Sequence, residues 1–199
     1  MLGYTVRPRC GMRRVGLPWR RQARRRSVRP GPQVKRGYAM KVIIYTDGSS
    51  RGNPGPGGYG AVLRFTDSAG QLHQKELSAG YRCTTNNRME IMGVIAALEC
   101  LLRPCEVEVH SDSQYVVNAI NKRWIQGWQR KGWVNSKKEP VKNPDLWKRL
   151  IKAMEPHDVT FVWVRGHAGA ELNERCDRLA VAAAMGPKAT LLDDAGFEG

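Results

Sequence analysis

Segments with strand-like and helix-like patterns alternate along most of this chain, and their order allows few folds. Three runs that are β-branched or alternate in polarity come first, at residues 41–46, 59–66 and 71–82. A helical pattern then precedes each of two further strand patterns, at 106–110 and 159–165. Strands joined by short turns pair antiparallel, whereas strands separated by a helix pair parallel. The order therefore predicts an α/β fold with a five-stranded mixed sheet, an antiparallel meander plus parallel strands, and helices on both faces.

Four helices are expected around these strands, over residues 85–102, 113–121, 144–155 and 172–185. The first would place five apolar side chains on one face: Met89, Met92, Ile95, Leu98 and Leu102. Thr85 is its expected N-cap, and Asn143 followed by Pro144 is a typical start for the third helix. The Gly- and Pro-rich stretch 48–58 is expected to be an irregular loop.

The positive charge of the chain is concentrated at its N-terminus. Of 33 Lys and Arg residues in 199, 12 lie in residues 1–40, which contain no Asp or Glu. The other 159 residues carry 21 basic and 18 acidic side chains, so most of the net charge of +15 lies in residues 1–40, which we call the leader. A polyanionic partner such as nucleic acid must therefore be argued from local basic patches.

The leader lacks apolar periodicity and is expected to be disordered. It could be an extension upstream of a true start at Met40, a basic arm that holds nucleic acid, or an organelle transit peptide. A folded domain is expected at residues 41–186, followed by a flexible C-terminal tail at 187–199. No apolar run is long enough for a spanning helix, so no membrane association is expected. Five cysteines without a C-x-x-C pair favour a reducing compartment, and we expect a cytoplasmic protein.

Four acidic residues have positions that suggest a shared site. Asp47 and Asp112 each follow a predicted parallel strand, and the carboxyl ends of such strands border the ligand crevice of an α/β sheet. Either one alone is also typical of a turn or a helix cap. Glu90 and Asp177 lie on predicted helices, where each could simply be a solvated acid. Together, four carboxylates could bind Mg²⁺, which prefers oxygen ligands.

Two further features suggest chemistry on a nucleic acid. His167 lies in a Gly-flanked loop after the last strand, where an imidazole could transfer protons. Residues 122–138 contain six basic residues, no acids and three tryptophans. Part of this segment would anchor a short helix through Trp124 and Trp128, and the rest indicates a surface that binds phosphates and sugars.

Five motifs in order then resemble one family. They are YTDGSSRGNPGPGGYGA, TTNNRME, SDSQYV, KGWVNSKKEPVKNPDLW and GHAGAELNERCDRLA. Together they closely resemble type 1 ribonuclease H of the bacterial kind, from about residue 41 to residue 185. The resemblance implies the ribonuclease H-like fold.

The resemblance also implies an activity. It implies an endoribonuclease that cleaves the RNA strand of RNA–DNA hybrids and leaves 5′-phosphate and 3′-hydroxyl ends. Two Mg²⁺ ions would bind with the substrate, and Mn²⁺ is a possible substitute. Asp47, Glu90, Asp112 and Asp177 would be the catalytic metal ligands, and His167 would handle protons near product release. A monomer without an obligate protein partner is expected.

The same resemblance assigns the substrate contacts. Asn53, Asn86, Asn87 and Gln114 would read the minor groove, and Thr85 would contact a DNA phosphate. The basic, Trp-rich segment would be the handle that lies on the DNA strand, through Lys122, Trp124, Lys131, Trp133 and Lys137. Some family members have an arginine two positions before the threonine, whereas this chain has Cys83 there and Arg82 next to it, so the phosphate pocket could differ.

Three other functions compete with this interpretation. A transposase, integrase or junction-resolving enzyme could share the acidic cluster, although TTNNRME and the handle disfavour it. A non-catalytic protein that binds hybrids should lack a carboxylate, and none is missing. A metal-binding regulatory domain would leave the basic handle without a role.

Overall fold

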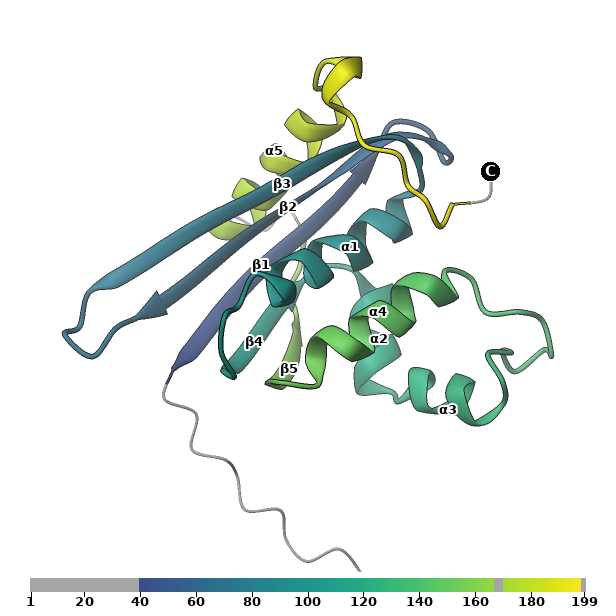
Figure 1. Ribbon diagram of the computed structural model, residues 1–199, viewed down its shortest axis with the longest axis horizontal. Helices are drawn as coiled ribbons and strands as arrows, with labels where there is room; N and C mark the ends of the chain where they lie inside the picture. Colours follow the sequence, from purple (N-terminus) through teal and green to yellow (C-terminus); the bar gives the residue numbers. More distant parts are fainter. Residues whose placement is uncertain (1–39, 167–169, 198–199) are drawn as a thin grey trace, which may run out of the picture. The chain divides into compact units, whose positions relative to one another are not determined.

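The computed structural model describes residues 40–166 and 170–197. Over these residues the sheet has five strands: β1 (Lys41–Ser50), β2 (Gly55–Thr66), β3 (Leu72–Thr84), β4 (Glu106–Ser111) and β5 (Asp158–Trp163). Their order is β3-β2-β1-β4-β5 (Figure 1). The pairs β3–β2 and β2–β1 are antiparallel, and the pairs β1–β4 and β4–β5 are parallel. The predicted mixed sheet is confirmed.

Helices cover both faces of this sheet, as predicted. They are α1 (Asn86–Glu99), α2 (Gln114–Asn121), α3 (Trp124–Arg130), α4 (Pro144–Met154), α5 (Glu171–Ala184) and a short 3₁₀ helix (Lys188–Thr190). Helix α1 packs on one face with α4 against it, whereas α5 crosses the opposite face behind β1, β2 and β3 (Figure 1). No helix among the described residues is long and apolar enough to cross a membrane.

The glycine-rich stretch 48–58 is largely strand rather than loop, so that prediction was wrong. Strand β1 continues to Ser50 and β2 begins at Gly55. A Cβ at Gly58 would lie 2.7 Å from the Ala180 carbonyl oxygen, and one at Gly60 would lie 2.1 Å from that of Cys176. These glycines therefore allow α5 to pack closely on β2, a tertiary role that the sequence pattern does not distinguish from turn formation.

Helix α1 is shorter than predicted, but it forms the centre of the core. Most of its side chains are buried, and it ends at Glu99 with Cys100 as its C-cap. Leu102, expected on the apolar face, is 100% exposed. Pro104 cannot donate a backbone hydrogen bond and lies just before β4, so the chain turns instead of continuing the helix. Thr85 occupies the N-cap position, although its side chain makes no capping hydrogen bond.

The C-terminal segment, expected to be a flexible tail from residue 187, packs against the body over its described part. The Arg82 amide donates to the Leu192 carbonyl at 2.9 Å, and the Leu192 amide donates to the Gly80 carbonyl at 2.8 Å. Leu191 is buried. These bonds pair Leu192 with the edge of β3. They also bring Asp194, two residues further on, to α1.

An ion network at the start of α1 explains why the tail is held. The Arg88 side chain is 2% exposed and donates to Asp194 at 2.6 Å and to Asp145 at 2.7 Å. The Asp194 side chain is 3% exposed and also accepts a 2.7 Å bond from the Thr84 hydroxyl. Burial alone would lower the pKa of Arg88, but hydrogen bonds to Asp194 and Asp145 outweigh it and raise the pKa. Similarly, burial would raise the pKa of Asp194, but the bonds from Arg88 and Thr84 lower it.

Candidate active site

Two of the predicted carboxylates meet at the carboxyl edge of the parallel strands. Strand β1 pairs with β4 so that Thr46 lies opposite Ser111. Asp47 and Asp112 therefore occupy the next position on the two neighbouring strands. The Gly48 amide donates to Asp47 Oδ1 at 2.7 Å, which orients that carboxylate.

A glycine on β1 brings the third carboxylate into place. A Cβ at Gly48 would lie 2.3 Å from the Glu90 amide nitrogen, so α1 packs on β1 at a distance that only glycine allows. Glu90 consequently lies beside Asp47 and Asp112. One carboxylate oxygen from each of these three residues lies within 4.8 Å of the others. We call this group the carboxylate cluster.

The electrostatics of the carboxylate cluster are unfavourable in the absence of a cation. Glu90 is 7% exposed, and its Oε1 accepts a hydrogen bond from the Asn86 side chain at 3.3 Å. Its Oε2 is buried without a hydrogen-bond partner among the described residues. Burial raises the pKa of Glu90 well above its ordinary value, and the charges of Asp47 and Asp112 raise it further. Converging carboxylates with a buried member whose pKa is raised favour a functional site over a structural one.

The simpler roles considered for these acids do not fit the structure. Ser113, rather than Asp112, caps α2, since its hydroxyl accepts from the Val116 amide at 3.4 Å. Glu90 is buried, so it is not a solvated acid in the first turns of a helix. Both side chains are therefore available for the shared site.

Of the two remaining predicted residues of this site, the structure describes only Asp177. Asp177 lies half-buried on α5 and is not among the three carboxylates within 4.8 Å. His167 lies outside the described residues.

Two contacts to Asp112 were not anticipated from the sequence. The Trp163 indole nitrogen donates to the Asp112 carbonyl oxygen at 3.1 Å, and the Asn173 amide donates to Asp112 Oδ2 at 3.3 Å. Asn173 precedes Asp177 by four residues on α5, so the two share a helix face. That spacing is the signal that could have identified it.

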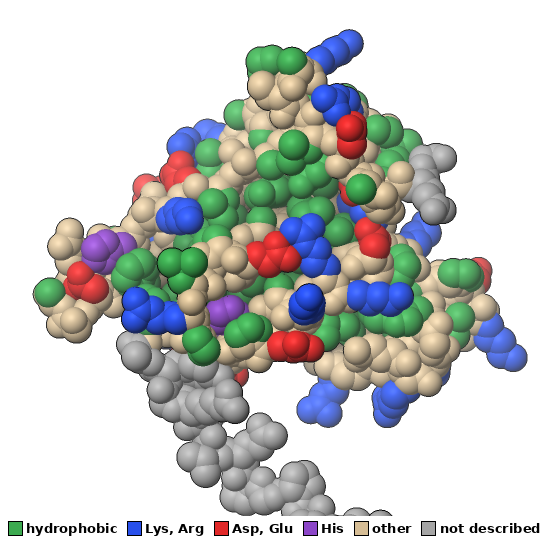
Figure 2. Space-filling model, in the orientation of Figure 1, with side chains coloured by type: hydrophobic (Ala, Val, Ile, Leu, Met, Phe, Trp, Pro, Cys, Tyr) green, Lys and Arg blue, Asp and Glu red, His purple; other side chains and the backbone are tan. Residues whose placement is uncertain are grey.

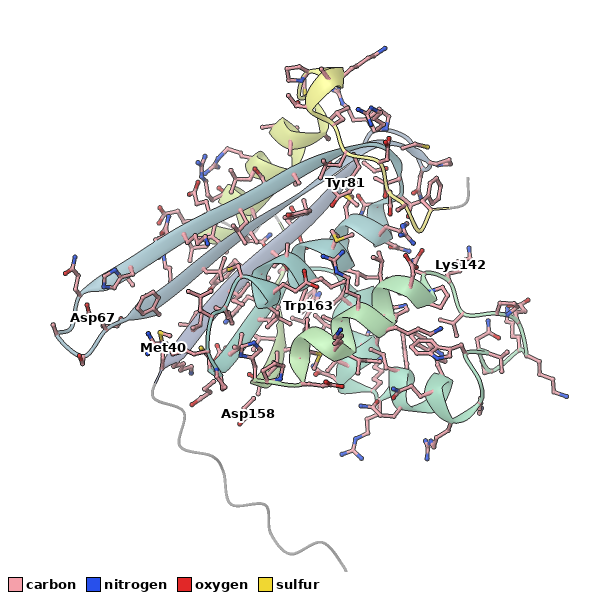
Figure 3. All side chains as sticks on the ribbon, viewed as in Figure 1. Met40, Asp67, Tyr81, Lys142, Asp158 and Trp163 are labelled. Carbon is pink, nitrogen blue, oxygen red and sulfur yellow. The ribbon has the colours of Figure 1, made fainter. Side chains whose placement is uncertain are left out.

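Four of the predicted substrate contacts gather at the N-terminal end of α1. Asn53 Oδ1 accepts from the Asn86 amide at 3.2 Å, which ties the loop after β1 to this helix. Thr85, Asn87 and Asn53 line a cavity of about 650 Å³. Lys142 also lines it, just before α4 where Figure 3 labels this residue, and adds a cation that the sequence analysis did not single out.

Gln114 is the first residue of α2 and is exposed. It borders a smaller cavity of about 250 Å³ together with Lys122 and Trp163. Figure 3 labels Trp163. Trp163 links this cavity to the chain at Asp112, since its indole nitrogen donates to the Asp112 carbonyl oxygen.

The handle combines an anchor and exposed cations. Trp128 packs against buried Trp147 with ring centroids 5.7 Å apart, which fixes α3 to the body. The Lys122 ammonium lies 5.9 Å from the Trp124 ring, and the Lys148 ammonium lies 5.2 Å from the Trp133 ring. The side chains of Lys131 and Lys137 are exposed. Lys and Arg side chains project around α3 and the loop after it on the face shown in Figure 2.

The departure from the family pattern also has a structural context. Cys83 is exposed, and the neighbouring Arg82 donates to Asp193 of the C-terminal segment at 2.6 Å. Arg82 is therefore used to hold the tail.

Comparison with known proteins identifies the family. Residues 39–185 match the family model for RNase H. The chain belongs to the ribonuclease H family.

Curated relatives give the same result at high identity. The ribonuclease H of Lachnoclostridium phytofermentans is 60% identical over 156 residues, which is 78% of this chain and 98% of that protein. The ribonuclease H of Edwardsiella ictaluri is 55% identical over 157 residues, 79% of this chain and 96% of that protein. This ribonuclease H is accordingly an enzyme, a hydrolase of the endonuclease type, as predicted.

Solved structures agree on the fold. LC9-RNase H1, described as a type 1 RNase H with the type 2 active-site motif, is 31% identical with a TM-score of 0.67, over 79% of each chain. The N-terminal RNase H domain of rv2228c from Mycobacterium tuberculosis is 32% identical with a TM-score of 0.53, over 73% of this chain and 94% of that chain.

The residues of the carboxylate cluster fit a divalent metal ion. They supply hard oxygen ligands, which Mg²⁺ and similar cations prefer. A bound cation would also compensate the mutual repulsion that raises the pKa of Glu90, and it would supply a partner for the orphaned Oε2.

Proposed function

We propose that this ribonuclease H hydrolyses the RNA strand of RNA–DNA hybrids with Mg²⁺ and leaves 5′-phosphate and 3′-hydroxyl ends. The observation that carries the proposal is the carboxylate cluster, in which oxygens of Asp47, Glu90 and Asp112 lie within 4.8 Å. Membership of the ribonuclease H family supports the choice of substrate.

Asp47, Glu90 and Asp112 would hold the metal, and Asp177 would complete the set from α5. Two divalent cations held there would supply the Lewis acidity needed to activate a water for attack on a phosphodiester and to stabilise the departing 3′-oxygen. The protein contributes the placement of the carboxylates: Gly48 lets α1 approach β1, and the parallel register aligns Asp47 with Asp112. We propose His167 as the residue that moves protons during product release.

Substrate selection would use the surfaces on either side of the carboxylate cluster. Asn53, Asn86, Asn87 and Gln114 carry amides that both donate and accept, which suits base edges and 2′-hydroxyls in the minor groove. Thr85 would contact a DNA phosphate. The handle, through Lys122, Trp124, Lys131, Trp133 and Lys137, would contact the backbone of the DNA strand.

We propose that residues 41–186 form the catalytic domain and that the enzyme acts as a monomer. All three residues of the carboxylate cluster come from one chain, so no second copy is needed to build the site. The four described cysteines form no disulfide, which supports a reducing compartment such as the cytoplasm.

Matched RNA–DNA, RNA–RNA and DNA–DNA duplexes, each labelled on one strand at a time, test this function. The proposal predicts cleavage of only the RNA strand of the hybrid, in the presence of Mg²⁺, and none with EDTA. Products should carry a 5′-phosphate and a 3′-hydroxyl. Cleavage of DNA, or hybrid binding without metal-dependent cleavage, would contradict it.

A further inference from the structure

Asp112 is held at two points, one on its backbone and one on its side chain. The Trp163 indole donates to its carbonyl oxygen at 3.1 Å, and Asn173 donates to its Oδ2 at 3.3 Å. A Cβ at Gly166 would lie 2.6 Å from the same Oδ2, so the backbone of Gly166 lies against that oxygen as well. The first contact fixes the main chain, whereas the second limits rotation of the carboxylate itself.

The amide of Asn173 is oriented by this contact. Rotating the amide by half a turn would place its oxygen against the oxygen of a carboxylate, which is repulsive, so the nitrogen must face Asp112. The side chain is 3% exposed, and its Oδ1 is buried without a hydrogen-bond partner among the described residues. A buried acceptor left unpaired costs stability, and a residue chosen only for packing would avoid that cost.

The location of Asn173 relates this cost to the chemistry. Asn173 lies one helical turn before Asp177, on the same face of α5, and its amide reaches the carboxylate cluster. A cation at this cluster would retain water molecules, and these would supply donors for a nearby unpaired oxygen. The arrangement is what a residue that orients a metal ligand requires.

We propose that Asn173 is a positioning residue: its donated hydrogen bond holds the Asp112 carboxylate in the orientation that binds the divalent cation. The inference rests on the proposed function, since it assigns a metal-binding role to Asp112. It goes further by assigning a role to a neutral side chain that is itself neither a carboxylate nor a proposed substrate contact.

Two substitutions separate this role from a structural one. Asn173→Ala removes the amide, whereas Asn173→Leu keeps the approximate size of the side chain and removes the donor without adding a charge. Ala182→Gly is the control, because it weakens α5 at an exposed position away from the carboxylate cluster. Each variant is compared with the full-length wild-type protein in three measurements. The first is the melting temperature without metal, and the second is the Mg²⁺ midpoint, the concentration that gives half the maximal rise in melting temperature. The third is kcat and KM on a hybrid.

Positioning predicts that Asn173→Ala needs about tenfold more Mg²⁺ for half the thermal shift, with no substrate present. Both Asn173 variants should lose about tenfold or more in kcat, with KM within about twofold of wild type. The control should lower the melting temperature and leave the Mg²⁺ midpoint and kcat unchanged. Asn173 variants that behave like the control would overturn the proposal, as would wild-type kcat in Asn173→Leu.

The measurements also distinguish this inference from the proposed function. If wild type cleaves hybrids and the Asn173 variants bind Mg²⁺ and turn over normally, only the positioning role fails. If wild type does not cleave hybrids, the proposed substrate fails, and the Mg²⁺ midpoint measured without substrate still tests the role of Asn173.

Discussion

Arg88 and Glu90 lie two residues apart in the first turns of α1, and both side chains are buried, yet their surroundings are opposite. Arg88 is enclosed by the carboxylates of Asp145 and Asp194 at 2.7 and 2.6 Å. Glu90 instead faces two further carboxylates, and its Oε2 has no partner among the described residues. The charge of Arg88 is compensated by opposite charges of the protein itself, whereas the charges nearest to Glu90 have the same sign as its own.

The difference shows how burial serves two purposes within one helix. A buried charge is tolerated when hydrogen bonds and opposite charges replace its hydration, and Arg88 meets this condition. A cluster of like charges destabilises the protein and persists where it has a function. The Arg88 network should therefore contribute stability, and the carboxylate cluster should contribute activity at the expense of stability.

The largest expected effect is on activity at the carboxylate cluster. Asp112→Asn should lower hybrid cleavage by more than about a hundredfold, since loss of a proposed direct metal ligand should exceed the usual effect of losing an outer contact. Hybrid binding, measured by fluorescence anisotropy, should survive. Asp158→Asn at the exposed start of β5 is the matched control and should cleave normally. Equal loss of binding and cleavage in Asp112→Asn would indicate a structural role.

Arg88→Met should mainly affect stability. Removing the arginine leaves Asp194 buried without its partner, which should cost about 3 kcal/mol, or a fall of roughly 10 °C in melting temperature. Arg149→Met is the control, because Arg149 pairs with Glu99 at 2.6 Å at an exposed position. It should cost less than about 1 kcal/mol in urea unfolding. Similar losses in the two variants would remove the contrast between buried and exposed pairs.

Glu90→Gln should act in the opposite direction from Arg88→Met and raise the melting temperature of the metal-free protein. The pKa of Glu90 is raised in the folded state, so folding favours its protonated form. The stability associated with this form is present below the ordinary pKa of 4.5 and is lost as the pH rises through the folded pKa. The gain from Gln should therefore be largest at alkaline pH and vanish in acid, in heat scans with EDTA. A lower melting temperature at pH 8 would show that Glu90 stabilises the fold.

The smallest expected effect is the pH dependence of stability due to Asp194, and its direction is opposite to that for Glu90. Its folded pKa is lowered, so its stabilisation is present above the ordinary value of 3.8 and is lost as the pH falls through the folded pKa. At neutral pH, Asp194→Asn should cost about 2 kcal/mol through the weakened bonds to Arg88. The difference from wild type in urea unfolding should narrow below about pH 4. A constant difference down to pH 2 would mean that the charge of Asp194 is not what matters.

The sequence predicted more of the carboxylate cluster than of the ion network around Arg88. Asp47 and Asp112 were predictable because the ends of parallel strands meet, whatever the details of packing. The Arg88–Asp194 pair was not, since the two residues are 106 positions apart and depend on a tail that carries no pattern of its own. Gly58 was wrongly assigned to a loop, because its role is close contact with α5 within β2. Asn173 was missed because its amide is neutral, although its spacing of four residues from Asp177 places both on one helix face.

The most direct test of this account is the titration of Glu90 itself, followed by NMR of its side-chain carboxyl carbon in protein labelled at glutamate, with Glu90→Gln to assign the signal. Without metal, the account predicts a titration well above the ordinary range, coupled to that of the neighbouring aspartates. Saturating Mg²⁺ should lower this midpoint, because the cation favours the charged form. A midpoint at the ordinary value that Mg²⁺ does not move would contradict the account.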